Sequence, residues 1–150
     1  MSSEDALVVR RLGPGDEAIA ARVLLAIAEV FEEPREALPD AYVRDLLARA
    51  DFWLIAAIED GEPRGGLTAH TLPMTRTASR EVFLYDIAVT EGAQRRGVGR
   101  RLVATLRDLA RAEGIKVVFV PAGDEDTRAV EFYRALGGEE EQVKIFTFGE

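Results

Sequence analysis

The stretch AVTEGAQRRGVGRRLVATLRDLARAEG, residues 88–114, joins the end of a strand pattern to an amphipathic helix. Two arginine pairs, 95–96 and 100–101, stand on either side of Gly97 and Gly99 in a chain whose formal net charge is −8. Arginines this close repel one another unless an anion lies among them, and glycines weaken a helix unless its backbone must approach another group. Because free N–H groups at a helix N-terminus attract anions, the stretch predicts a strand–turn–helix unit that binds phosphate.

This phosphate turn differs from two common phosphate-binding loops. A P-loop needs Gly-Lys-Ser or Gly-Lys-Thr, and a dinucleotide fingerprint needs G-x-G-x-x-G directly after the first strand. Neither occurs here, since the glycines come late in the chain and neither Gly97 nor Gly99 is followed directly by a lysine. The residues alone leave a second interpretation open, a glycine-softened turn with solvated arginines.

Strand and helix patterns alternate on both sides of the turn. Apolar alternation and turn residues predict strands over 6–12, 81–90 and 141–148, a buried strand over 115–122, and a hairpin over 51–74 with its tip at Asp60–Gly61. Apolar spacing of three and four predicts helices from the capping residue Asp16 to Phe31, from Asp40 onward with Tyr42, Val43, Leu46 and Leu47 inward, from the turn to Gly114, and over 126–138. The order predicts a mixed α/β fold, a central sheet with helices on both faces.

Length and composition limit the classes of function. A chain of 150 residues fits one domain over 1–150, and 47% hydrophobic with 31% charged residues is typical of a soluble globular protein. The absence of cysteine excludes disulfides, zinc–cysteine sites and a thiol nucleophile. Net negative charge argues against nucleic acid as a partner and suits a cationic small molecule. The acidic N-terminus, MSSEDALVVRRL, and the lack of a long apolar run predict a cytoplasmic protein with no membrane span.

Two motifs carry a resemblance to a known family. QRRGVG, residues 94–99, resembles the Q/R-x-x-G-x-G/A pyrophosphate loop of the GNAT superfamily of acetyl-CoA-dependent N-acetyltransferases. AVEFYRALGG, residues 129–138, resembles the second signature of that superfamily, A-x-x-F-Y-x-x-x-G. Their order and spacing agree with the family, and the resemblance covers residues 5–148. It implies the GNAT fold, a central, mostly antiparallel sheet flanked by helices, with acetyl-CoA bound where two strands splay apart.

A narrower resemblance concerns the segment LPMTRTASREVFLYDIAV, residues 72–89. It resembles a segment of the type I aminoglycoside 3-N-acetyltransferases, and the tail 133–148 resembles their ending loosely. Gly123 and Arg128 replace an aspartate and a proline of that subfamily, and His70 stands where a tyrosine is common. These departures bear on which amine is accepted.

The resemblance implies transfer of acetyl from acetyl-CoA to the 3-amino group of an aminoglycoside, by direct attack in a ternary complex. It also implies a homodimer that pairs through the final strand. Two alternatives stay open: a GNAT enzyme for another amine, such as a polyamine, a metabolite or a protein amino group, and a non-catalytic acyl-CoA-binding domain.

The resemblance also assigns residues to the acetyl-CoA site. The strand backbone would pair with the pantetheine arm, with the amide of Ala88 or its neighbour facing the thioester carbonyl, and the turn would bind the pyrophosphate. The residues expected to bind the cofactor are Ile87, Ala88, Val89, Gln94, Arg95, Arg96, Gly97, Val98, Gly99 and Arg100.

Two residues are expected to act in catalysis. Asp86 would hold the ammonium group of the substrate and accept its proton; its structural alternative is a strand aspartate bonded to a loop amide. Tyr133 would protonate the leaving thiolate; its alternative is a core aromatic residue paired with Phe132.

A third group is expected to bind the amine substrate: Glu32, Tyr85, Asp86, Asp126 and His70. His70 is the sole histidine, the residue type that titrates near neutrality, so it is a second candidate base or a structural residue. Acidic residues occur in two groups near the expected acceptor site: Glu29, Glu32, Glu33 and Glu36 in the first, and Asp124, Glu125 and Asp126 in the second. A solvated helix face, or for Asp126 a helix cap, is the competing interpretation. The pattern contains no metal-ligand constellation.

Overall fold

The computed structural model describes residues 7–34 and 36–149. It forms two compact units, one ending at Val120 and one beginning at Pro121. The first unit contains β1 (Leu7–Leu12), α1 (Glu17–Val30), α2 (Asp40–Ala48), β2 (Phe52–Glu59), β3 (Glu62–Pro73), β4 (Arg80–Val89), the short helix η2 (Glu91–Ala93), α3 (Val98–Ala112) and β5 (Val118–Phe119). The second contains α4 (Thr127–Ala135). A single domain over 1–150 stays a prediction.

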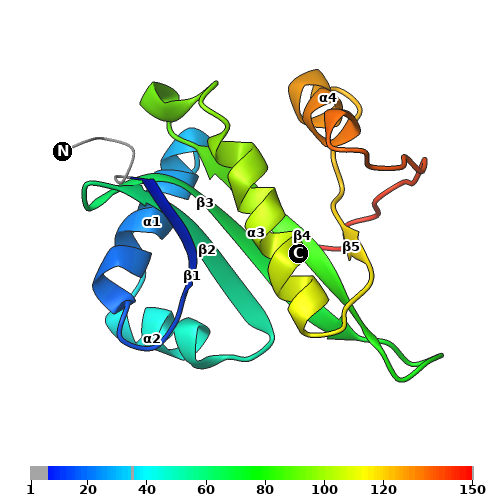
Figure 1. Ribbon diagram of the computed structural model, residues 1–150, viewed down its shortest axis with the longest axis horizontal. Helices are drawn as coiled ribbons and strands as arrows, with labels where there is room; N and C mark the ends of the chain where they lie inside the picture. The colour runs from blue at the N-terminus through cyan, green and yellow to red at the C-terminus, as the bar shows by residue number, and fades with distance from the viewer. Residues whose placement is uncertain (1–6, 35, 150) are drawn as a thin grey trace. The chain divides into compact units, whose positions relative to one another are not determined.

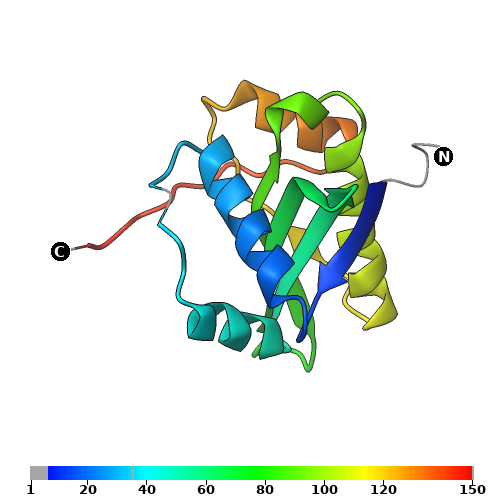
Figure 2. The same cartoon turned by 90° about the vertical axis from the view of Figure 1, so that its left-hand side faces the viewer.

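The sheet has the order β1-β2-β3-β4-β5. The pairs from β1 to β4 are antiparallel and β4–β5 is parallel, so the sheet is mixed but mostly antiparallel. Figures 1 and 2 show α1 and α3 on opposite faces of it. This arrangement confirms the predicted fold class.

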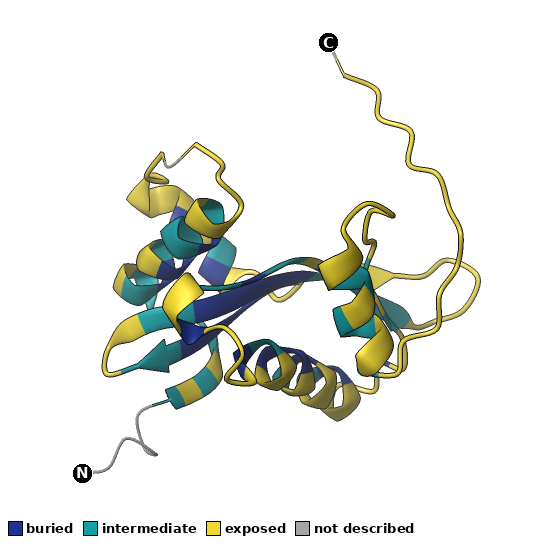
Figure 3. Ribbon diagram, turned by 90° about the horizontal axis from the view of Figure 1, so that it is seen from above, coloured by how far each residue is buried: buried dark blue, intermediate teal, exposed yellow. Residues whose placement is uncertain are grey.

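Two consecutive glycines of β3 let the helices approach the sheet from both sides. A Cβ on Gly66 would lie 2.7 Å from Cγ1 of Val23 in α1, and a Cβ on Gly65 would lie 3.3 Å from Cγ1 of Val98 in α3. Because successive strand residues face opposite sides, β3 separates two layers of core. Figure 3 shows the central strands buried between α1 and α3, and α3 exposed on its outer side.

The β2–β3 hairpin turns where the sequence predicts it. Asp60 and Gly61 have φ of 53° and 79°, the pair of positive values that a tight two-residue turn between twisted strands requires. Trp53 and Ile55 of β2 are completely buried. The spacing of Val98, Leu102, Leu106 and Leu109 predicts an apolar stripe on α3; the first three are buried and Leu109 is half-buried.

Four expectations about local structure are wrong. Tyr42 is 54% exposed, because α2 is short and buries only Val43 and Leu47 fully. Asp16 occupies the N-cap position of α1, but its carboxylate accepts the N–H of Gly13 (2.8 Å) and the guanidinium of Arg10 (3.1 Å) instead of a helix N–H.

The other two errors concern the strands after α3. The strand predicted over 115–122 pairs only at Val118 and Phe119, and Val117 is exposed. Residues 141–148 form no strand in the described structure, although their β-branched and aromatic residues predict one. Four of them are strongly exposed: Val143, Ile145, Phe146 and Phe148. An alternating pattern becomes a strand only where a neighbouring strand supplies its hydrogen bonds, and the pattern does not say where that neighbour is.

None of the helices within residues 7–34 and 36–149 combines the length and apolar character that crossing a membrane requires.

Candidate active site

A bulge in β4 places Asp86. Thr68 pairs with Asp86 and Ala69 pairs with Leu84, so the pairing skips Tyr85. Paired residues share a face, and the extra residue reverses the alternation along β4. Leu84 therefore shares the α3 face with Ala69, whereas Asp86 shares the α1 face with Thr68. Without the bulge, regular alternation from Leu84 would place Asp86 on the α3 face; with the bulge its carboxylate lies on the α1 face.

Beyond the bulge, β4 parts from β5. Their pairing ends at Phe83 and Phe119, while β4 continues to Val89. Among the described strands, none pairs with this edge of residues 84–89. Ile87, Ala88 and Val89, which were predicted to pair with pantetheine, lie in this segment; the carbonyl of Ala88 faces Gly65 of β3, and that of Val89 accepts the amide of Gln94. The geometry fits an extended arm lying beside β4 as an added strand.

The phosphate turn follows directly. Arg95 and Gly97 have φ of 68° and 79°, and no side chain caps α3, whose N-cap is Gly97. The first backbone N–H groups of α3 therefore lack the acceptor that an N-cap side chain would supply, at the positive end of a 15-residue helix. This end of the helix fits a pyrophosphate, which would accept those hydrogen bonds.

The arginines of the turn are not equivalent. Arg96 is held by Glu59, the last residue of β2: Nη1 and Nη2 donate to Oε1 and Oε2 at 3.1 and 2.7 Å. Arg95 and Arg100 are exposed. The amide of Gln94 donates to the carbonyl of Val89 at 3.1 Å, which ties the turn to the end of β4. The ten residues named for the cofactor remain predictions, but the side chain of Arg96 has a protein partner.

The Glu59 pair predicts a dependence of stability on pH. Arg96, and then Arg64, lower the pKa of Glu59 from 4.5 to about 2. The unfolded chain thus binds this proton more readily, so the stabilisation is complete above pH 4.5 and disappears as the pH falls toward about 2. We expect the difference in unfolding midpoint between wild type and Glu59→Gln to shrink over that range in urea titrations. A difference in unfolding midpoint that stays constant over this pH range would contradict the stabilising ion pair between Glu59 and Arg96.

The electrostatics around Asp86 bring three titratable groups together. Asp86 is half-buried, and burial is the main cause that raises its pKa; the negative charge of Glu33 raises it further and His70 opposes the shift. A carboxylate with a raised pKa, beside a second acid, is suited to receive a cation or a proton.

A row of rings lies beside this carboxylate. The His70 ring is 5.4 Å from Phe52 and 5.9 Å from Tyr85, and Tyr85 is 5.5 Å from Phe83. Phe83 stacks on Phe119 at 5.0 Å. The row crosses β2, β3, β4 and β5, and Tyr85 is 60% exposed. The structure thus brings together three of the predicted substrate residues, Asp86, His70 and Tyr85.

The two other predicted substrate residues, Glu32 and Asp126, have different local surroundings. Glu32 is exposed with φ of 58°, and Glu33, its neighbour, is the acid whose charge reaches Asp86. The sequence placed both in one acidic group but gave no reason to prefer Glu33. In the second unit Asp126 caps α4, accepting the N–H of Ala129 at 3.2 Å, and Tyr133 packs its ring 5.2 Å from that of Phe132. Tyr133 as a proton donor remains a prediction.

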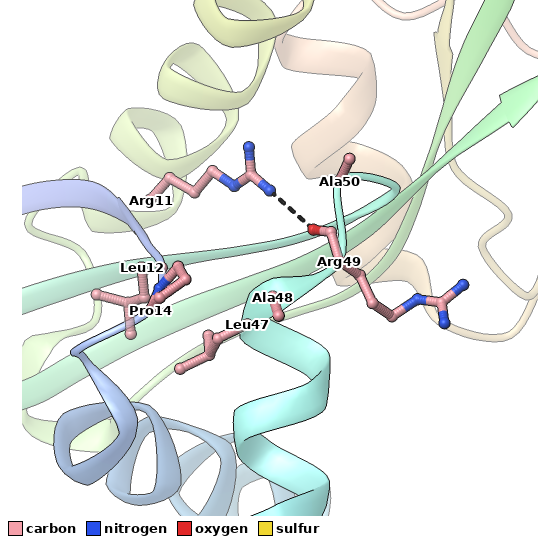
Figure 4. Close-up of a pocket in the computed structure, with 8 residues that line it drawn as sticks. Arg11, Leu12, Pro14, Leu47, Ala48, Arg49 and Ala50 are labelled. Atoms are coloured by element: carbon pink, nitrogen blue, oxygen red, sulfur yellow. Dashed lines mark hydrogen bonds between the residues drawn. The ribbon is translucent and has the colours of Figure 1, made fainter.

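Two hollows open on the first unit. One of about 340 Å³ lies where β1 ends beside α2 (Figure 4). Its Arg11 donates to the carbonyls of Arg49 (3.3 Å) and Phe52 (3.1 Å) and lies 5.5 Å above the Trp53 ring, so it braces the chain. A hollow of about 510 Å³ lies between α1, the start of β3 and Thr90. Among the described residues, no cluster of three His, Asp or Glu side chains could hold a metal ion.

Comparison with known proteins agrees with this geometry. The model of the acetyltransferase (GNAT) family matches residues 21–137. An uncharacterized N-acetyltransferase of Methanocaldococcus jannaschii is 28% identical over 103 residues, which are 68% of this chain and 46% of the relative. The chain thus matches less than half the length of that relative.

Solved structures are similar over nearly the whole chain. An aminoglycoside acetyltransferase from an uncultured soil metagenomic sample is 33% identical, with a TM-score of 0.90, over 100% of this chain and 99% of the other. A second such enzyme, crystallised with sisomicin, is 26% identical, with a TM-score of 0.92, over 99% of both chains. An aminoglycoside 6′-N-acetyltransferase in complex with CoA, 21% identical with a TM-score of 0.78 over 95% and 94% of the chains, shows the fold alone.

Proposed function

Because the chain belongs to the GNAT family of acetyltransferases and takes acetyl-CoA as its acetyl donor, we propose that it acetylates a primary amine of an aminoglycoside. The observation that carries the proposal is the half-buried Asp86 on the bulge of β4, whose pKa is raised by burial and by the negative charge of Glu33. Two carboxylates and an exposed aromatic ring suit an amino sugar, whose ammonium groups need anions and whose ring has an apolar face. The resemblance in residues 72–89 favours the 3-amino group as the acceptor.

The proposed chemistry follows from the chain's own groups. Bound acetyl-CoA supplies an activated thioester. Asp86 orients the amine and takes its proton as the nitrogen attacks the carbonyl carbon, so that a C–N bond forms and the C–S bond breaks. The amide of Ala88 or its neighbour stabilises the developing negative charge on the carbonyl oxygen. Proximity contributes much of the acceleration, because both reactants are held on one strand. The sulfur leaves as a thiol; Tyr133 is the proposed source of its proton.

The acceptor is tested by following release of free thiol from acetyl-CoA, a clean signal because the chain has no cysteine. The amines compared are gentamicin, sisomicin, apramycin, kanamycin, spermidine and a lysine peptide. We expect the highest kcat/KM with gentamicin-type compounds. If only spermidine or the peptide were acetylated, the substrate would be an amine other than an aminoglycoside. Binding of acetyl-CoA without any turnover would favour a non-catalytic domain.

We further propose that the chain forms a homodimer through residues 141–148. The side chains of Val143, Ile145 and Phe148 are 69%, 72% and 96% exposed, which is unfavourable in water unless a second copy covers them. We expect the wild type to sediment as a dimer and Ile145→Glu as a monomer, with Lys116→Glu, at an exposed lysine outside residues 141–148, as the control. A monomeric wild type would contradict this. Location in the cytoplasm stays a prediction.

A further inference from the structure

Glu59 joins the hairpin to the phosphate turn. Its Oε1 accepts Nε of Arg64 at 3.0 Å and Nη1 of Arg96 at 3.1 Å, and its Oε2 accepts Nη2 of Arg96 at 2.7 Å. The glutamate side chain is only 12% exposed. One carboxylate is thus shared by two arginines that are 32 positions apart in the chain.

The same part of the hairpin also holds the end of β4. The carbonyl of Arg64 accepts the N–H of Thr90 at 2.9 Å and its hydroxyl at 3.2 Å. Thr90 precedes the turn and Arg96 lies within it, so Arg64 and Glu59 fix the segment at two points. Between these points the backbone turns through Arg95, whose positive φ is unfavourable for a residue with a side chain. A turn of this kind persists only when its surroundings hold it.

The charges assign different tasks to the arginines. Glu59 is ionised at every pH at which an acetyltransferase works, since its pKa is about 2. Two of the five N–H donors of the Arg96 guanidinium are taken by Glu59, whose negative charge offsets the positive charge that would attract a phosphate. Arg95 and Arg100 have no ion-pair partner among the described residues, so their charge and donors stay available.

We propose that Glu59 is a positioning residue for acetyl-CoA: it holds the turn through Arg96, so that the N-terminal N–H groups of α3 are already aimed at the pyrophosphate. The guanidinium of Arg96 is then a brace for the turn and does not bind the phosphate. A turn held in the binding conformation loses less conformational freedom when the ligand arrives. This inference rests on the phosphate turn as the acetyl-CoA site and is independent of which amine is acetylated.

The test measures binding of CoA by calorimetry, without any acceptor, for Glu59→Gln, Arg96→Gln and the double variant. The control is Glu62→Gln. This variant removes an exposed carboxylate of the same hairpin, which is paired with Arg22 of α1. We expect each single variant to bind CoA about tenfold more weakly, the double variant to be no weaker than either, and the control to equal wild type. In turnover assays the KM for acetyl-CoA should rise while kcat stays unchanged.

Three results would overturn the inference. Weaker binding for Arg96→Gln with unchanged or tighter binding for Glu59→Gln would show that Arg96 contacts the phosphate itself. Additive losses in the double variant would show that the two residues act separately. A lower melting temperature for Glu59→Gln with unchanged CoA affinity would leave a purely structural ion pair. Loss of turnover with normal CoA binding would concern the acceptor proposal instead.

Discussion

Replacing Asp86 with asparagine is expected to lower kcat/KM for the acceptor amine by about 10²- to 10⁴-fold, the range that a positioned general acid or base contributes. The amide keeps the size of the side chain but loses the charge that holds an ammonium group and the site that takes its proton. Binding of CoA should be unchanged, because the phosphate turn lies beyond the other end of the strand segment 86–89. The measurement is steady-state kinetics with the preferred amine, together with calorimetry for CoA.

The melting temperature of Asp86→Asn distinguishes a loss of catalysis from unfolding of the variant. The pKa of Asp86 is raised in the folded protein, chiefly by burial and then by Glu33. The folded state therefore binds this proton more readily than the unfolded chain, and stability falls as the pH rises above the ordinary value of 3.8. At neutral pH the ionised Asp86 is destabilising, so Asp86→Asn should melt at the same temperature as wild type or higher.

The matched control is Asp45→Asn, which removes one exposed carboxylate from α2. It should alter neither kcat/KM nor the melting temperature. Full activity of Asp86→Asn would contradict the assigned role, and a fall in melting temperature would show that Asp86 is structural.

Replacing Gly65 with valine is expected to destabilise the fold by about 2 kcal/mol, as overpacking of a filled core does. A Cβ at this position would lie 2.9 Å from the carbonyl oxygen of Ala88 and 3.4 Å from Cδ1 of Leu102. The carbonyl belongs to the backbone and cannot rotate away, so β4 and α3 must both move away from β3. Since α3 carries the phosphate turn at its N-terminus, CoA should also bind about tenfold more weakly.

Gly92→Val is the control for this substitution. Nothing lies within 4 Å of a Cβ at Gly92, and its φ is not in the positive range. Urea unfolding and CoA calorimetry should find this variant close to wild type. Equal stability of Gly65→Val and wild type would contradict the packing of α3 against β3 and β4.

The sequence predicted the first unit well where local chemistry decides the structure. The Asp60–Gly61 turn, the α3 stripe and the glycine-bearing turn before α3 each depend on neighbouring residues. The prediction failed for residues 115–122 and 141–148, where the structure depends on which strand edge is available. That information lies in distant residues of the chain.

The candidate site was predicted in part. The Tyr85-Asp86 pair stood out in the sequence, but the bulge that turns Asp86 toward α1 shows only in the pairing with Thr68 and Ala69. Glu33 was not separable from Glu32 by sequence, because adjacent acids in a loop differ only in direction. The pairing of Arg96 with Glu59 joins residues 37 positions apart and left no local pattern.

The most direct test of the proposed function is the structure of the product formed from sisomicin and acetyl-CoA. Mass spectrometry and NMR should show a single acetyl group on the 3-amino nitrogen, formed by the wild type and far more slowly by Asp86→Asn. An acetyl group on another nitrogen would support an aminoglycoside as the acceptor but contradict acetylation at the 3-amino position. Unmodified sisomicin, with acetyl-CoA bound normally, would contradict the proposal that an aminoglycoside is the acceptor.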